Sequence, residues 1–282
     1  FRRVLFRSKK GDTVHVPSPT RGAASAKGAT NAVTLIAATE NEVQIAIDKH
    51  YEYSRLIEDI VETQALNSLR QFYTDDAGYA LAKQVDSDLI QLGRAFNGAT
   101  IGTNDYATSN SSTKAYIGSD GTTAYNSATS NAAALTDAAI RRTIQRLDDN
   151  DTPMDGRFFI IPPSSRNTLM GLARYTEQAF VGDGNAIRNG EIGNLYGIPV
   201  FVTSNADFGA GNTGADRICL MGHRDSMVLV EQMGVRSQTQ YKQEYLATLY
   251  TADMIYGVKA MRTAATTGAA TSSSAFALAV PA

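Results

Sequence analysis

The hydrophobic positions between Thr74 and Gly98 recur with the period of an amphipathic helix. Thr74 is a candidate N-cap, and Asn97-Gly98 is a common helix stop. The pattern predicts a spine helix over 74–97 that, at about 1.5 Å per residue, spans roughly 30 Å. Its apolar stripe runs at steps of four, four, three and four residues: Leu81, Val85, Leu89, Leu92 and Phe96. Its polar residues are expected to be exposed: Lys83, Gln84, Asp86, Asp88 and Gln91.

Residues 11–53 have the two-residue period of β-strands instead. The segment DTVHV at 12–16 alternates and stops at a Pro-Ser-Pro turn, and apolar residues alternate again from Val43 to Ile47. A small, polar stretch at 20–32 separates the two. We therefore expect 11–53 to form a long projecting β-excursion, whose open strand edges need a partner surface.

In the middle of the chain, strand and helix patterns alternate. Thr136 is placed to cap a helix, a short apolar run at 158–161 is typical of a buried strand, and a further strand is expected at 196–203. This alternation over 131–205 predicts a compact α/β unit.

The last third of the chain is mostly extended up to Arg262. Short strands are expected at 218–221 and 227–230, and a longer extended run follows from Gln238. The tail 263–282 is of low complexity and has few large apolar residues, so we expect it to be disordered or weakly docked.

Composition excludes several classes of protein. The formal net charge is −2 and the pI is about 6.0, so there is no global basic signature for nucleic-acid binding. The single cysteine, Cys219, excludes an internal disulfide framework, and its apolar surroundings predict a core residue rather than a nucleophile. No apolar run approaches the ~18 residues that a membrane span needs.

No arrangement of residues predicts catalysis. The three histidines, His15, His50 and His223, have no partners at metal-ligand spacing. The 223–225 motif HRD lacks the asparagine of a kinase loop, and GDG at 182–184 lacks the rest of a phosphate-binding fingerprint. Sequence therefore predicts no catalytic, cofactor-binding or metal site.

Five stretches, taken in order and spacing, resemble the tailed-bacteriophage major capsid proteins of the Hong Kong 97 fold. They are VQIAIDKHYEYSRLIEDIV, LAKQVDSDLIQLGRAF, FFIIPPSSRNTLM, NLYGIPVFVTSNA and LYTADMIYGVKAMR. The resemblance implies an α+β fold with an extended β-hairpin loop, a long spine helix in a peripheral domain, and an α/β axial domain.

The resemblance also implies a set of domain boundaries. In chain order, they are an N-terminal remnant at 1–10, an extended loop at 11–53, a peripheral domain at 54–130 and 215–262, an axial domain at 131–214, and a C-terminal tail at 263–282. We expect the first eight residues, FRRVLFRS, to be a translated adapter joined to a truncated gene.

The function that the resemblance implies is structural, not enzymatic. Many copies would assemble as pentamers and hexamers into an icosahedral head that encloses double-stranded DNA. The implied partners are portal and scaffolding proteins and, non-specifically, the packaged DNA, with no membrane and no cofactor. The protein would belong to the virion and assemble in the host cytoplasm.

In the family, the axial domain surrounds the capsomer centre and the extended loop lies over a neighbouring subunit. Candidate contact residues between subunits therefore lie in the loop tip, on the helix after Thr136 and in the polar loop at 176–194. They are Thr20, Arg21, Lys27, Arg141, Arg142, Arg146, Asp183, Asn185 and Arg188. The three helix arginines otherwise suit a solvated face.

Two alternatives are also compatible with the sequence. The same fold could form an encapsulin-like bacterial nanocompartment, which neighbouring genes would distinguish from a phage head. A hydrolase using a serine and His223 is the other, although the chain lacks a G-x-S-x-G elbow.

Overall fold

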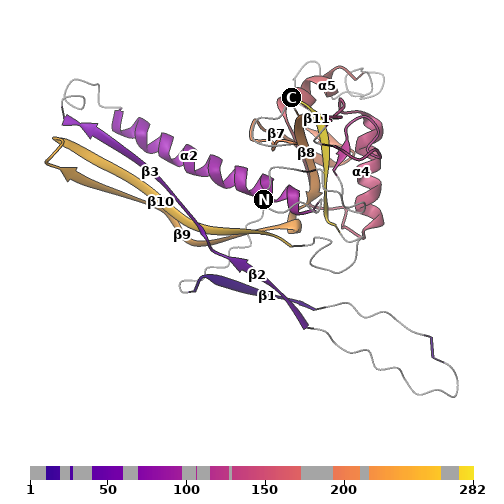
Figure 1. Ribbon diagram of the computed structural model, residues 1–282, viewed down its shortest axis with the longest axis horizontal. Helices are drawn as coiled ribbons and strands as arrows, with labels where there is room; N and C mark the ends of the chain where they lie inside the picture. Colours follow the sequence, from indigo (N-terminus) through magenta and orange to yellow (C-terminus); the bar gives the residue numbers. More distant parts are fainter. Residues whose placement is uncertain are drawn as a thin grey trace.

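The structure, a computed structural model, describes residues 11–19, 26–27, 40–59, 69–96, 106, 115–126, 129–172, 193–209, 216–261 and 273–282. Three sheets organise these residues (Figure 1). They are the two-stranded β1-β2, the three-stranded β3-β10-β9 and the six-stranded β4-β11-β8-β5-β7-β6. Within the described part of the chain, no helix has the length and apolarity needed to cross a membrane.

The long helix α2 spans Leu69–Gln91, so the predicted spine helix exists but its expected start is wrong. Thr74 lies inside the helix and does not cap it. The preceding residue, Tyr73, packs against the cluster formed by Ile57 and Tyr250. This tertiary contact stabilises helical structure before the local capping signal.

The helix also ends before residue 97. Leu92 interrupts it, and the short helix α3, Gly93–Phe96, follows. At this junction the backbone N–H of Leu92 donates to the carbonyl of Leu89 at 3.2 Å, and Ala95 donates to Leu92 at 3.0 Å. Such i to i−3 bonds tighten the last turn relative to an α-helix.

Helix α2 lies along the three-stranded antiparallel sheet (Figure 1). The strands are β3, Lys49–Glu58, β10, Ala247–Ala260, and β9, Met227–Lys242. Leu81 and Ala77 of the helix bury against alternate residues of β10, including Tyr250 and Met254. The long extended run predicted near the end of the chain is thereby confirmed.

The arm, which is the hairpin of β1 and β2, spans Thr13–Pro19 and Glu40–Ala46. The prediction of a projecting hairpin is confirmed, but its boundary at 53 is wrong. The hairpin ends where the N–H of Ile47 donates to the carbonyl of Asp12 at 2.8 Å, and the chain from Lys49 onward already pairs with β10.

The six-stranded sheet carries helices α4, Asp137–Asp149, and α5, Pro163–Met170. As predicted, Thr136 caps α4, its side chain accepting from the N–H of Ala139 at 3.3 Å. The strands are β4, Tyr116–Ile117, β5, Arg157–Ile161, β6, Asn194–Leu195, β7, Ile198–Val202, β8, Asp216–His223, and β11, Ala275–Pro281.

The tail prediction is wrong for residues 273–282, and residues 263–272 lie outside the described residues. Strand β11 is central and buried, antiparallel to β8 on one side and parallel to β4 on the other. Leu278 and Val280 pack into one core cluster, and Ala277 and Ala279 pack into another on the opposite face. Small residues alternate with large ones, which suits a strand covered on both faces.

The six-stranded sheet also extends beyond 131–205, where the sequence predicts the α/β unit. Strand β4 comes from before residue 131, and β8 and β11 come from after residue 214. The α/β unit therefore combines β4 to β8 with β11, which follows β9 and β10 of the three-stranded sheet in the chain.

Candidate assembly surfaces

The arm is attached at its base by one apolar face. Val14, Val16 and Ile45 pack with Val228 and Val230 at the start of β9. From this attachment the hairpin extends away from both larger sheets (Figure 1). Its two strands pair only with each other among the described strands, so both outer edges remain open.

The opposite face of the arm is polar and exposed. His15 Nδ1 lies 3.0 Å from Glu42 Oε2, and Gln44 Nε2 donates to Glu42 Oε1 at 2.6 Å. The hydrogen bonds from Gln44 and His15 lower the pKa of Glu42 below its ordinary value. This exposed face of the arm therefore carries an ionised carboxylate at neutral pH.

Gly257 of β10 allows the arm to lie very close to the three-stranded sheet. A Cβ at this position would lie 2.2 Å from the backbone oxygen of Ala46, far inside normal contact. Only glycine lets the end of β2 cross β10 so closely.

We expect Gly257→Ala to lower the free energy of unfolding by about 1–3 kcal/mol, because backbone must shift to admit the methyl group. Chemical denaturation of the unassembled subunit measures this change. The matched control is Gly78→Ala in α2, where no atom lies within 4 Å of the added Cβ. That control should be neutral or stabilising, since alanine favours helix. Equal stability of Gly257→Ala and wild type would contradict the steric argument.

The far end of the three-stranded sheet exposes large apolar side chains. Tyr245 and Leu246, in the turn between β9 and β10, are 63% and 67% exposed, and Phe72 of α2 is 62% exposed. Tyr241 donates its hydroxyl to Asp59 at 2.8 Å. A single chain leaves this end of the molecule partly apolar and uncovered.

On the face of this sheet that is turned away from α2, charged side chains of neighbouring strands interact. Arg236 of β9 donates to both carboxylate oxygens of Asp253 at 3.1 and 2.8 Å, and His50 Nε2 lies 3.3 Å from Asp253. The hydrogen bond from Arg236 is the main reason that the pKa of Asp253 is lowered.

The three arginines of α4 do not converge on one site. Arg141 bonds to Asp137 at 2.9 Å, and Arg142 bonds to Gln145 at 2.8 Å, both on the exposed face. Arg146 instead lies 3.4 Å over the ring of Tyr116, and burial lowers its pKa. Arg141 and Arg142 are the two available to a neighbour.

The other predicted contact residues divide by whether the structure describes them. Lys27 is exposed. Five residues lie outside the described residues: Thr20, Arg21, Asp183, Asn185 and Arg188.

A buried ionic network, which sequence reasoning missed, joins α3 to the loop after β7. Arg94 donates to Asp207 through Nε at 2.7 Å and Nη2 at 2.5 Å, and the Tyr106 hydroxyl donates to the same carboxylate at 2.9 Å. Arg94 and Asp207 are 1% and 4% exposed. Burial alone lowers the pKa of Arg94, but the bonds to Asp207 raise it above its ordinary value.

A second buried carboxylate corrects the expectation of an exposed helix face. Asp88 of α2 is only 5% exposed. It accepts from the Tyr256 hydroxyl at 2.6 Å and pairs with Lys49 Nζ at 3.1 Å. No local sequence signal marks either ion pair, because the two paired charges are more than 30 positions apart in each.

With this geometry established, comparison with known proteins identifies the family. A model described as phage capsid protein matches residues 5–267. The chain belongs to the phage capsid protein family. A search of curated proteins found no match.

Solved structures share the fold of this capsid protein. The capsid of cyanophage P-SCSP1u gives a TM-score of 0.70 at 19% identity, covering 98% of this chain and 85% of that one. A structure of Mycobacterium phage Che8 gives 0.67 at 19% identity, covering 96% and 85%. The capsid of Ralstonia phage GP4 gives 0.65 at 16% identity, covering 100% and 86%.

The resemblance to capsid proteins of the Hong Kong 97 fold is therefore confirmed. The chain is a phage capsid protein, a structural component of the virion. Neither the nanocompartment nor the hydrolase alternative is supported.

In this capsid protein, His223 is held by backbone groups. Its Nε2 lies 2.9 Å from the carbonyl of Asp155, and Nδ1 accepts from the N–H of Asp225 at 3.2 Å. Cys219 is fully buried, which raises the pKa of its thiol to about 12. Both residues therefore serve packing and backbone bonding in the described structure.

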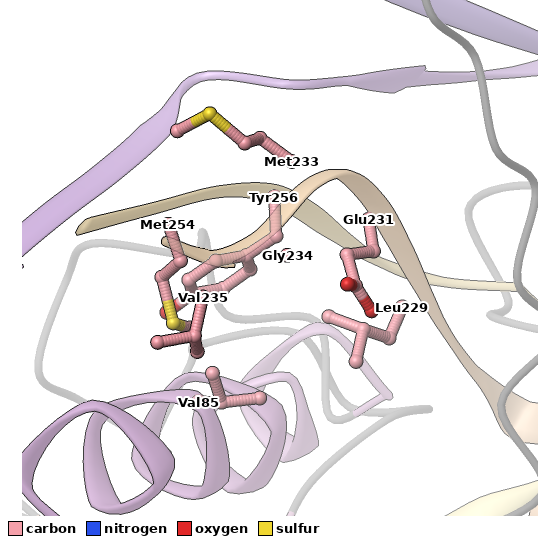
Figure 2. Close-up of a pocket in the computed structure, with 8 residues that line it drawn as sticks. All are labelled: Val85, Leu229, Glu231, Met233, Gly234, Val235, Met254 and Tyr256. Atoms are coloured by element: carbon pink, nitrogen blue, oxygen red, sulfur yellow. The ribbon is translucent and has the colours of Figure 1, made fainter. Parts of the chain in front are cut away.

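One pocket of about 180 Å³ lies between α2 and a bulged part of β9 (Figure 2). Val85, Leu229 and Met254 make it largely apolar, and the carboxylate of Glu231 lies at its side. Among the described residues, no group of three or more His, Cys, Asp or Glu side chains is placed to hold a metal. The pocket is a packing hollow at a sheet irregularity.

Proposed function

We propose that this capsid protein forms the icosahedral head of a tailed bacteriophage, enclosing double-stranded DNA without catalysing a reaction. The observation that carries the proposal is the arm. It buries one face against its own β9 and leaves two open edges and a polar face directed away from the body. A hairpin of this kind is marginal alone and gains stability by contacting another surface.

We assign the two larger sheets to the domains that the family resemblance implies, although β4, β8 and β11 lie outside the implied axial range 131–214. The sheet β3-β10-β9 with α2 is the proposed peripheral domain, and the six-stranded sheet with α4 and α5 is the proposed axial domain. In this arrangement the axial domain surrounds the centre of pentamers and hexamers. Arg141 and Arg142 of α4, and Lys27 in the arm, are the described candidates for contacts with neighbours.

Assembly on this proposal depends on many modest contacts. Interfaces of obligate assemblies bury roughly 2,000–5,000 Å² or more, and each polar contact at their rim contributes little by itself. The exposed apolar residues at the end of the three-stranded sheet fit such a distributed interface.

We also propose the partners that a phage head requires. Portal and scaffolding proteins would meet the shell during assembly in the host cytoplasm. Contact with packaged DNA would be non-specific and weak, since a net charge of −2 provides no strong attraction to phosphate.

Electron microscopy of the purified protein, alone and with the scaffolding protein encoded nearby, tests the proposed function. We expect closed, icosahedral shells in at least one condition. A discrete monomer that persists in every condition, scaffold included, would contradict the proposal.

A further inference from the structure

The far half of β9 is uncovered on both faces. Every residue from Gly234 to Tyr241 is exposed, whereas Met227, Val228 and Val230 at the start of the strand are buried. Residues 236–242 belong to none of the hydrophobic clusters among the described residues. This half of the strand therefore contributes little to the core of its own chain.

The same half of β9 is a regular edge strand. Sheet order places β9 outermost, paired with β10 alone among the described strands. Residues 236–242 pair one by one with 247–253, and the register shifts occur only beyond Asp253. Seven residues at about 3.4 Å each give an edge of roughly 24 Å whose outward backbone groups can pair.

This edge lacks the protection that edge strands usually carry. The opposite edge of the sheet, β3, has four charged residues: Lys49, Glu52, Arg55 and Glu58. By contrast, Ser237–Tyr241 reads SQTQY, without charge or proline. The nearby Arg236 is already bonded to Asp253 within the sheet. Charges and prolines prevent edge pairing in monomeric proteins, and over residues 236–242 of this edge they occur only at the two ends, Arg236 and Lys242.

We propose that the outer edge of β9 pairs antiparallel with the same edge of a second copy, across a twofold axis of the shell. The inference rests on the proposed assembly into an icosahedral shell. Such a shell contains twofold axes, and a twofold contact uses the same surface on both copies.

The sequence of the edge suits pairing with itself. A pairing centred on Thr239 places Gln238 of one copy opposite Gln240 of the other, where the two amides can bond to each other. Ser237 comes opposite Tyr241, which is 48% exposed in a single chain. At the ends, Lys242 comes opposite Arg236, whose charge Asp253 compensates.

The contact would be weak between two free subunits and effective in the shell. One pair of short strands buries far less than the ~1,200 Å² typical of stable interfaces. Once other contacts hold the subunits, however, the pairing becomes intramolecular and its effective concentration rises. The contact therefore belongs to the assembled particle rather than to a stable dimer.

A disulfide at the centre of the pairing tests it. Directly opposed residues of antiparallel strands have Cβ atoms about 4.5–5.5 Å apart, near the range a disulfide needs. We expect assembled Thr239→Cys shells, after mild oxidation, to give covalent dimers on non-reducing gels. Buried Cys219 should not react, and the matched control Ser54→Cys on the β3 edge should give no dimer. Absence of dimers from assembled Thr239→Cys shells would overturn the proposal.

A charge at the same position gives a second test. Thr239→Lys places two like charges opposite each other, so we expect about a tenfold lower yield of shells at fixed protein concentration. The control Ser54→Lys adds the same charge to the other edge and should assemble like wild type. Wild-type yield from Thr239→Lys overturns the strand pairing. Wild-type protein is assembled in parallel, and its shells test the proposed function directly. Normal yield from Thr239→Lys would therefore contradict the strand pairing but not the proposed function.

Discussion

Replacing Arg94 by methionine is expected to lower the free energy of unfolding of the subunit by about 3–5 kcal/mol. The substitution removes both hydrogen bonds to Asp207, a carboxylate that is only 4% exposed. Asp207 would keep the hydrogen bond from the Tyr106 hydroxyl but lose its positively charged partner. An unpaired buried charge destabilises the folded state. Urea denaturation of the unassembled subunit measures the difference.

The exposed ion pair of α4 provides the matched control. Arg141 bonds to Asp137 at 2.9 Å, but its side chain is 58% exposed. Arg141→Met should therefore change the free energy of unfolding by less than about 1 kcal/mol. The double variant Arg94→Met with Asp207→Leu should be more stable than Arg94→Met alone, because it also removes the unpaired carboxylate. Equal losses from Arg94→Met and Arg141→Met would contradict the role given to burial.

Shortening the arm is expected to abolish shells while leaving the subunit folded. In the variant, Asn-Gly replaces residues 18–41, so that Pro17 and Glu42, which already face each other across the hairpin, are joined by a two-residue turn. The packing of Val14, Val16 and Ile45 on β9 is kept. Circular dichroism should show a melting temperature within a few degrees of wild type, and electron microscopy should show no closed particles.

The control for this variant is Lys27→Ala, which keeps the full length of the arm and removes one exposed cation. It should assemble with at most a modest loss, since one rim charge contributes little. Normal shells from the shortened variant would show that the arm does not reach a neighbour. Unfolding of that variant would show instead that the arm supports its own core.

Elements marked by a regular spacing of apolar residues, or by a capping residue, were predictable from the sequence. The stripe through Leu81 and Leu89 predicted the spine helix, and Thr136 marked the start of α4. The alternation around Val14 and Ile45 predicted the arm. Each signal lies within a few neighbouring residues, and neighbouring residues determine which side chains share a face of a helix or strand.

Elements that depend on distant partners were not predictable in the same way. The alternation from Phe276 to Val280 was present in the tail, but the strand forms because β8 and β4 pair with its edges and distant residues cover its two faces. Likewise, α2 begins before Thr74 because Tyr73 packs against another element.

By itself, the sequence determined the type and order of the main elements and, through the order of five stretches, the capsid family. Only the tertiary structure decided which strands share a sheet, where the arm leaves the body, and that Arg94 and Asp88 are buried with partners. The physical reason is that periodicity reports on which face of an element is apolar. The partner of a buried charge, or of a strand edge, is set by distant chain segments, as for Arg94 and Asp207, which are 113 positions apart.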